Sequence, residues 1–301
     1  MHNLSGHAVS SHATFFHSTS LHSIGVFDSG IGGLTVVREL FESVPHERIV
    51  YFGDTARVPY GTRSVETVQR YAREDTELLL AHDVRLIVIA CNTVSAVALD
   101  EVIALAQDIP VIGMIEPATH EALRKTKNGK IGVIGTPATV ASAAYDRAIT
   151  ALATREGRSV HVESAACPLF VPLAEEGWMH HKATELIARE YLQPLVDHEI
   201  DTLILGCTHY PVLEETIRNV MGDHITLINS GAVAAREVER WVIQTNEPTA
   251  ASTTQPDHLM LVSDVPGKFQ TVGERFLGRT LPTVRQVVFK ESWVVRRETA
   301  V

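Results

Sequence analysis

Two cysteines in similar sequence contexts are the residues best suited to chemistry. Cys91 follows the run RLIVIA, Cys207 follows the run DTLILG, and polar residues come directly after each. The pKa of a free cysteine, about 8.5, can be lowered by cationic neighbours or by a helix N-terminus. Two thiols on opposite faces of one carbon could remove a proton from one face and return one to the other, with one acting as thiolate and the other as thiol. The pair therefore predicts proton transfer at a carbon centre.

The polar residues after each thiol could bind a small acid. Asn92 and Thr93 follow the first cysteine, and Thr208 and His209 follow the second. If a helix begins at these points, its first backbone N–H groups form an anion site. Hydroxyl, amide and imidazole groups can also hold carboxylates, and His209 could exchange protons with the neighbouring thiol.

Each of these residues also has a structural interpretation. Asn92 and Thr93 could cap a helix, His209 could be a hydrogen-bonded core histidine, and a single cysteine is often a small buried hydrophobe. The repeated order of strand, cysteine and polar residues favours chemistry for the pair, whereas for Cys167 we favour the buried role. Three cysteines in 301 residues do not indicate a disulfide framework.

Three further segments hold candidate site residues. In FDSGIGG, Asp28 could orient a thiol or relay protons and Ser29 could bind substrate, but turn and N-cap roles are equally open. This segment departs from the dinucleotide-binding fingerprint. Tyr60 and Gly61 lie in a Pro-Tyr-Gly turn that offers a phenol and backbone N–H groups, or is an ordinary loop. In CPLFVPLAEEG two prolines argue against a regular helix, so we expect a loop that holds Glu175 over a cleft or leaves it in solvent.

Short apolar runs rich in β-branched residues alternate with longer helical stretches, which predicts an α/β fold with mainly parallel sheets covered on both faces. Strands are expected at Ile24–Phe27, Ile49–Phe52, Leu86–Ala90, Val111–Ile115, Ile131–Ile134, Leu203–Leu205, Thr226–Ile228, His258–Ser263 and Val284–Phe289. Helices are expected at Val65–His82, Glu185–Val196 and Ala232–Ile243, and a surface loop is expected at Thr245–Asp257.

A weak internal repeat suggests two similar lobes. IGVFDSGIGG at Ile24 matches IGVIGTPATV at Ile131, 107 residues later, and the two cysteines are 116 residues apart. We expect a first lobe of residues 23–115 plus 230–301 and a second lobe of residues 116–229. Because ligands of α/β sheets bind beyond the carboxyl ends of the strands, facing lobes would bring both thiols to one cleft.

Composition limits the partners. The net charge of −10 argues against nucleic acid as the main partner, and no apolar run approaches the ~20 residues of a membrane helix. Residues 1–22 contain five regularly spaced histidines among Ser and Thr. They lack the pattern of a signal peptide, so we expect a flexible extension, with weak metal binding as the alternative.

Six segments together resemble the glutamate racemases of bacterial cell-wall synthesis. They are VFDSGIGGLTVV, YFGDTARVPYG, ACNT, CPLFVPLAEEG, LGCTHYPVL and the closing segment SDVPGKFQTVGERFLG. The resemblance implies two α/β lobes with the site between them and interconversion of L- and D-glutamate without pyridoxal phosphate or metal. It also implies a cytoplasmic protein, commonly a homodimer, that supplies D-glutamate for peptidoglycan.

The resemblance also implies roles for individual residues. Cys91 would take the proton from D-glutamate with help from Asp28. Cys207 would take it from L-glutamate with help from His209 and Glu175. Substrate would be held by Asp28, Ser29, Tyr60, Gly61, Asn92, Thr93, Thr208 and His209.

Other functions remain open at this point. A racemase for aspartate or a related acid would use the same two thiols, since pocket length is invisible in sequence. A non-catalytic two-lobe clamp for a small acid is a second alternative, and a decarboxylase or isomerase on the same architecture is a third.

Overall fold

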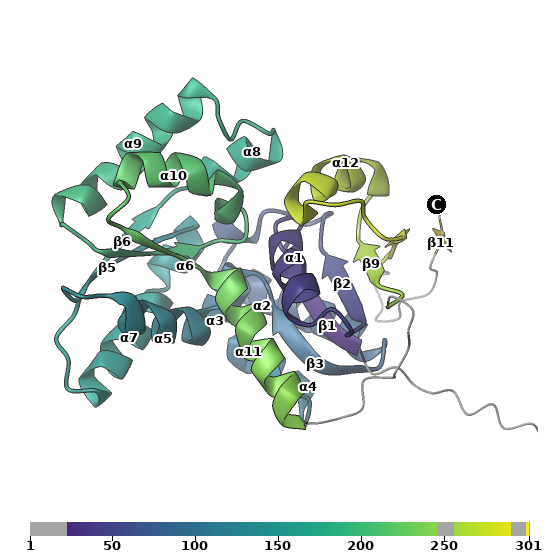
Figure 1. The fold of residues 1–301 in the computed structure, drawn as a ribbon. Helices are drawn as coiled ribbons and strands as arrows, with labels where there is room; N and C mark the ends of the chain where they lie inside the picture. Colours follow the sequence, from purple (N-terminus) through teal and green to yellow (C-terminus); the bar gives the residue numbers. More distant parts are fainter. Residues whose placement is uncertain (1–22, 246–255, 290–298, 301) are drawn as a thin grey trace, which may run out of the picture.

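The structure is a computed structural model that describes residues 23–245, 256–289 and 299–300 (Figure 1). The predicted extension over residues 1–22 lies outside the described residues. So does most of the predicted loop Thr245–Asp257, of which Thr245 is the last residue of a helix.

The first sheet has seven strands in the order β11-β10-β9-β2-β1-β3-β4. All neighbouring strands are parallel except β10 and β11, which are antiparallel. The strands are β1 (Ser23–Asp28), β2 (Ile49–Gly53), β3 (Val84–Ile89), β4 (Val111–Ile112), β9 (Leu259–Val262), β10 (Val284–Gln286) and β11 (Thr299–Ala300). Strands β1 and β2 are buried along their whole length, as expected for a sheet covered on both faces.

The second sheet has four parallel strands in the order β6-β5-β7-β8. They are β5 (Lys130–Gly135), β6 (His161–Ala166), β7 (Thr202–Gly206) and β8 (Thr226–Asn229). In the β5–β7 register Gly135 lies opposite Gly206, so the turns that follow these two strands begin side by side at the carboxyl edge.

Helices cover both sheets (Figure 1). Around the first sheet are α1 (Leu34–Ser43), α2 (Val65–Leu80), α3 (Asn92–Val97), α4 (Leu99–Ala106) and α12 (Pro266–Leu277). Around the second are α5 (Ile115–Lys125), α6 (Pro137–Ala141), α7 (Ala144–Arg155), α8 (Phe170–Glu175), α9 (Lys182–Asp197) and α10 (Glu214–Met221). Two 3₁₀ turns, η1 (Tyr60–Thr62) and η2 (Tyr210–Leu213), complete these elements.

Helix α2 shows how the sequence fixes an element. The side chain of Ser64 accepts a hydrogen bond from the Thr67 backbone N–H, which satisfies one of the free donors at the helix start. Val68, Ala72 and Leu79 recur on one face and are buried against the sheet.

Helix α11 (Ser230–Thr245) connects the two sheets. It packs against α1 of the first lobe and α5 of the second, and Figure 1 shows it running between them. A second link is the Thr35 hydroxyl on α1, which donates to the Thr208 carbonyl at 2.8 Å. With the two lobes joined in this way, the turns that follow β1, β3, β5 and β7 line one cleft.

The α/β fold class with two mainly parallel sheets flanked by helices is confirmed. Strand β6 was not predicted, because its sequence HVESAA lacks a continuous apolar run. The expected strand at Val111–Ile115 is only two residues long, and Ile115 begins helix α5. The expected strand Val284–Phe289 likewise ends at Gln286.

The predicted loop around Glu175 is wrong, because Phe170–Glu175 forms helix α8. Pro172 is the third residue of this helix, where the backbone N–H has no intrahelical acceptor. A proline in this first turn therefore removes no hydrogen bond. Glu175 ends the helix and is partly buried.

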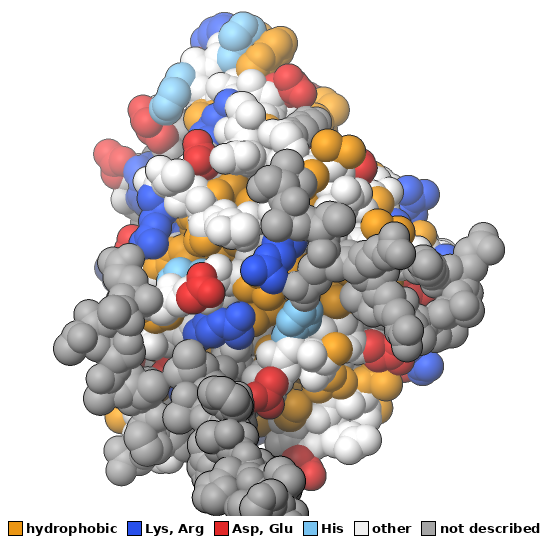
Figure 2. All heavy atoms as spheres, turned by 90° about the vertical axis from the view of Figure 1, so that its right-hand side faces the viewer, with side chains coloured by type: hydrophobic (Ala, Val, Ile, Leu, Met, Phe, Trp, Pro, Cys, Tyr) orange, Lys and Arg blue, Asp and Glu red, His pale blue; other side chains and the backbone are white. Residues whose placement is uncertain are grey.

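On the face that Figure 2 shows, acidic, basic and apolar side chains are interspersed outside the grey region. Within the described part of the chain, no helix is both long enough and apolar enough to cross a bilayer.

Candidate active site

Both predicted thiols line the same small cavity between the lobes, with a volume of about 130 Å³. Cys91 and Cys207 are only 5% and 6% exposed. Cys207 directly follows strand β7, and Cys91 is the second residue after strand β3. The cavity also contacts nearly all the other predicted site residues, which are Ser29, Tyr60, Gly61, Asn92, Thr93, Glu175, Thr208 and His209. Asp28 is the exception, since it is buried behind the cavity wall.

The glycine-rich turn after β1 allows this close approach of the two lobes. A Cβ atom on Gly32 would lie 2.3 Å from Thr208 Oγ1 and 2.4 Å from His209 Nδ1. These distances are shorter than any normal van der Waals contact. Glycine at position 32 therefore lets the first-lobe turn pack directly on the residues that follow Cys207.

Cys207, His209 and Glu175 form a hydrogen-bonded series. The Sγ atom of Cys207 is 3.9 Å from His209 Nδ1, and His209 Nε2 is 3.2 Å from Glu175 Oε1. A carboxylate oxygen can only accept, so Nε2 carries the proton and Nδ1 is left to accept from the thiol. This is the general arrangement of a nucleophile or base, an imidazole and an orienting carboxylate.

Cys91 has a different set of partners. It is the N-cap residue of α3. Hydrogen bonds from the Val94 backbone and from the hydroxyl and backbone of Ser29 lower its pKa, but burial and the charge of Asp28 raise it more, to about 12. Within the described residues, therefore, Cys91 has no imidazole partner equivalent to His209.

The pKa of Cys207 is also raised above that of an ordinary thiol. Burial is the main cause, the backbone N–H of His209 lowers the pKa, and the charges of Cys91 and Asp28 raise it. Each thiol therefore disfavours ionisation of the other. Both are protonated at neutral pH in the empty site, and forming a thiolate requires a cation or a proton acceptor in the cleft.

Asp28 is such an acceptor close to the thiols. Its Oδ2 atom accepts hydrogen bonds from the backbone N–H groups of Gly30 at 3.1 Å and Gly33 at 3.0 Å. Its buried Oδ1 atom has no hydrogen-bond partner among the described residues. Burial raises the pKa of Asp28, and its electrostatic interaction with the nearby His209 offsets part of that effect. A raised pKa makes this carboxylate a stronger base than an ordinary aspartate, which suits a proton acceptor beside a thiol.

Thr136 lines the cavity but lies outside the predicted set. Its hydroxyl is 2.9 Å from that of Thr93 and 2.9 Å from that of Thr139, which joins the two lobes through three hydroxyl groups. A signal for it was present in the repeat, because the offset of 107 residues carries Ser29 onto Thr136.

The polar side-chain atoms of two predicted site residues are hydrogen-bonded to other protein side chains. The Tyr60 hydroxyl contacts the carboxylates of Asp54 and Asp75, so it faces away from the cavity that its residue lines. The side chain of Asn92 accepts a hydrogen bond from the Tyr145 hydroxyl at 2.6 Å, and its amide nitrogen is 3.4 Å from Ser230 Oγ. Tyr145 and Ser230 therefore fix the orientation of Asn92.

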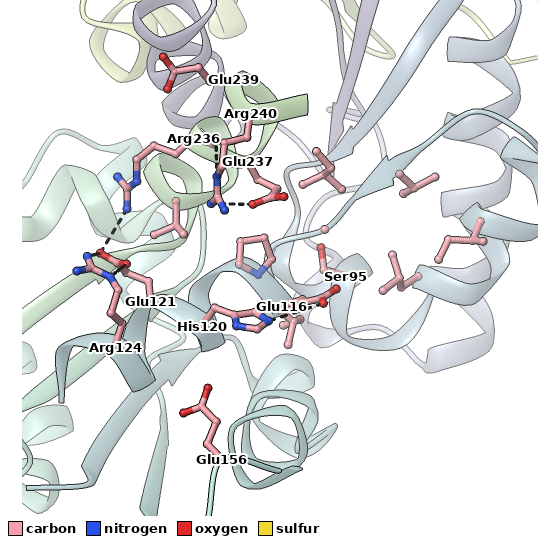
Figure 3. A pocket seen from close by; sticks show the side chains of 18 of the residues that line it. Ser95, Glu116, His120, Glu121, Arg124, Glu156, Arg236, Glu237, Glu239 and Arg240 are labelled. Atoms are coloured by element: carbon pink, nitrogen blue, oxygen red, sulfur yellow. Dashed lines mark hydrogen bonds and ion pairs between the residues drawn. The ribbon is translucent and has the colours of Figure 1, made fainter. Parts of the chain in front are cut away.

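A second cavity, about 1190 Å³ in volume, lies among α4, β4, α5 and α11 (Figure 3). No cysteine lines it. Its arginines are paired with carboxylates, as Figure 3 shows for Arg124 and Arg236 with Glu121 and for Arg240 with Glu237. This cavity is larger than the cleft, but it has no pair of thiols, and several of its carboxylates are paired with its arginines, so the chemistry is assigned to the cleft.

Comparison with known proteins agrees with this arrangement. Residues 24–238 match the family model described as Asp/Glu/Hydantoin racemase. The chain is 51% identical over 263 residues to a glutamate racemase of Chlorobaculum parvum, covering 87% of this chain and 95% of the relative.

Solved structures give the same result. The chain is similar to a glutamate racemase from Francisella tularensis in complex with D-glutamate, with 39% identity, a TM-score of 0.80, and coverage of 88% of this chain and 97% of that chain. It is also similar to a glutamate racemase isoform from Bacillus anthracis, with 37% identity, a TM-score of 0.82, and coverage of 90% and 98%. The protein belongs to the Asp/Glu/Hydantoin racemase family, and the three relatives just described are glutamate racemases.

Proposed function

We propose that this chain interconverts L- and D-glutamate by transferring the Cα proton between Cys91 and Cys207. The observation that supports this best is that both thiols line one small cleft, each from the carboxyl edge of a different sheet. In one direction Cys207 as thiolate takes the proton from L-glutamate, and the Cys91 thiol donates its proton to the opposite face of the carbanion. The reverse sequence converts D-glutamate. The two thiols serve as base and acid, so the proposal invokes no cofactor.

The two thiols would reach the thiolate form by different routes. On one side His209 can take the proton of Cys207, since its Nδ1 atom is the acceptor and Glu175 stabilises the resulting imidazolium. On the other side Asp28 is the nearby acceptor for Cys91, and its raised pKa suits that exchange. After each turnover the thiols hold the opposite protonation states, and these two groups would reset them.

The substrate itself would help to ionise a thiol. Its α-ammonium group enters a cleft in which burial keeps the pKa of both thiols high. A cation within a few ångströms favours the thiolate and lowers that pKa. The base would therefore form when the substrate binds, and the empty enzyme would keep unreactive thiols.

The cleft supports a small polar substrate. Its volume of about 130 Å³ is below that of sites for drug-sized ligands. Among the described residues that line it there is no lysine or arginine, so the substrate carboxylates would be bound by neutral donors. We assign this to the hydroxyls of Ser29, Thr93, Thr136 and Thr208 and to backbone N–H groups near Gly61 and Asn92. The ring and backbone of Tyr60 would shape the wall.

We also propose the cellular setting that the family implies. D-glutamate would supply peptidoglycan synthesis, the protein would act in the cytoplasm, and it would form a homodimer. The lobe boundaries at residues 23–115 plus 230–301 and 116–229 stand as part of this proposal. They are supported by the strand content of each sheet.

Solvent exchange tests the mechanism. In deuterated water, proton NMR follows loss of the glutamate Cα–H, and circular dichroism follows inversion. We expect wild type to exchange and invert both enantiomers. We expect Cys207→Ser to exchange D-glutamate without inverting it, and Cys91→Ser to exchange only L-glutamate. Cys167→Ser is the matched control, because Cys167 is a buried thiol that does not line the cleft, so the variant should behave as wild type.

Two results would contradict the proposal. Glutamate that binds without exchange or inversion in the wild-type protein would indicate a binding protein. Turnover of aspartate with no turnover of glutamate, in a panel of both enantiomers of each acid, would move the activity to the shorter substrate.

A further inference from the structure

Three metal-binding side chains meet on the second lobe, away from the cleft. His161 and Glu163 are two residues apart on strand β6, so they point to the same face of the sheet. That face packs against helix α9, and His198 is the residue that follows its last turn. The site is at the start of β6, whereas the cleft lies beyond the other end of this strand, near Cys167.

The separations of the three side chains fit ligands of one ion. The Nε2 atoms of His161 and His198 are 3.7 Å and 3.8 Å from the same oxygen of Glu163. Both distances are too long for hydrogen bonds. Ligand atoms about 2.0–2.2 Å from a tetrahedral zinc ion are roughly 3.3–3.6 Å apart. One donor atom from each of the three residues already lies within 4.8 Å of the others.

The ring of His198 is already oriented for such a role. Its Nδ1 atom is 2.7 Å from the carbonyl oxygen of Pro194. A carbonyl can only accept, so Nδ1 donates to it, and in the neutral ring Nε2, which faces Glu163, is left to bind a metal. Metal-binding histidines commonly use this hydrogen bond to fix their tautomer and direction.

The neighbouring charges leave the site available to a cation. Lys130 lies opposite His161 in the register of β5 and β6. Its ammonium group is paired with Glu199 at 2.8 Å, so its charge is largely compensated. His161 and His198 are about half exposed, which leaves room for water to complete the coordination.

We propose that His161, Glu163 and His198 bind one divalent transition-metal ion, best matched by zinc. Imidazole and carboxylate ligands suit this class of metal, and an ion there would tie the edge strand β6 to the end of α9. Because it binds the folded state, the metal would raise stability. It takes no part in the reaction proposed for the cleft.

Titration with cobalt(II) and zinc at pH 7.5, where free imidazoles are mostly neutral, tests this proposal. The protein is a full-length variant in which the five histidines of residues 1–22 are alanine, so that they cannot compete. We expect one tight site, visible cobalt bands without a thiolate charge-transfer band, and a rise in melting temperature with zinc. His161→Ala, His198→Ala and Glu163→Gln should each weaken binding at least about tenfold and remove the zinc-dependent rise, with racemase activity retained as the check on folding.

His180→Ala is the control variant, because His180 forms an exposed pair with Glu215 and belongs to no group of three ligands. It should bind metal as the parent does. Unchanged affinity in all three site variants, or a cobalt spectrum dominated by thiolate ligation, would overturn the proposal.

Discussion

The Sγ atom of Cys207 lies 3.9 Å from the Nδ1 atom of His209, on the side of the imidazole opposite Glu175. A thiol and an imidazole at this distance can share a proton. Cys91 lacks an equivalent partner among the described residues and has Asp28 nearby instead. The proposed reaction treats the two enantiomers of glutamate alike, but its two thiols lie in chemically different surroundings.

Replacement of Glu175 by glutamine tests the role of the carboxylate. The amide oxygen can still accept from His209 Nε2, but it no longer stabilises an imidazolium. We expect kcat to fall about tenfold or more, up to the ~10²–10⁴-fold contribution of a general base. Circular-dichroism assays with each enantiomer measure the effect. The neighbouring Glu176→Gln keeps the helix end and lies outside the cleft lining, so it should retain activity, and equal rates for both variants would remove Glu175 from the mechanism.

The pH dependence of alkylation tests the state of Cys91 in the empty site. Burial raises its pKa to about 12, so the thiolate fraction should increase about tenfold for each pH unit below that value. We expect the rate of iodoacetamide labelling, followed by peptide mass spectrometry, to keep rising from pH 7 to pH 9.5. A plateau near pH 8.5, the ordinary thiol pKa, would contradict the burial effect.

Asp28→Asn should separate stability from activity. Burial raises the pKa of Asp28 in the folded protein, so the unfolded chain loses this proton at a lower pH than the folded protein does. The folded protein therefore loses stability as the pH rises from the unfolded pKa of about 3.9 to the pKa of Asp28 in the folded state. At pH 7 the variant should melt above wild type, by roughly 2–4 °C for each kcal/mol regained, and the difference should shrink as the pH falls toward 4. Racemisation should decrease strongly. A lower melting temperature for the variant at pH 7 would mean that the two N–H bonds to Asp28 dominate.

Thr136→Val tests the residue that the sequence predictions left out. The change removes a hydroxyl from the cleft and the N-cap hydrogen bond in which the Thr136 side chain accepts from the Thr139 backbone N–H. We expect KM for glutamate to rise about tenfold, consistent with ~1.4 kcal/mol per decade, and stability to fall by about 1 kcal/mol. Thr136→Ser keeps the hydroxyl and should restore both quantities. A normal KM in Thr136→Val with reduced stability would limit Thr136 to capping.

Several site residues could be predicted because strand ends are readable from sequence. Cys207 directly follows strand β7, and Cys91 is the second residue after strand β3. The resemblance to the family implied that His209 and Glu175 act beside Cys207. The direction of the Tyr60 hydroxyl could not be predicted, because it depends on Asp75 in helix α2. Pro172 likewise indicated a loop, since the sequence alone did not show that it would occupy the first turn of a helix.

Strand β6, at the edge of the second sheet, could not be predicted for a related reason. Strand β6 has polar and small residues, and only its pairing with β5 makes it a strand. The predicted strand pattern relied on continuous apolar runs, which describe central strands such as β5 and β7. An edge strand is less buried and needs no such run.

Gly32→Ala tests the packing of the two lobes at the cleft. The added methyl would lie within 2.5 Å of Thr208 and His209, and it can be accommodated only by moving the His209 ring or separating the lobes. Either movement would break the Cys207–His209 contact, so we expect kcat/KM to fall at least about 100-fold, the scale of a 1 Å misplacement of catalytic groups. Gly267→Ala is the control, because a Cβ there meets nothing within 4 Å, and alanine in a helix adds up to about 1 kcal/mol of stability. If Gly32→Ala retained full activity in the circular-dichroism assay, the imidazole would tolerate displacement and its contact with Cys207 would not be required for proton transfer.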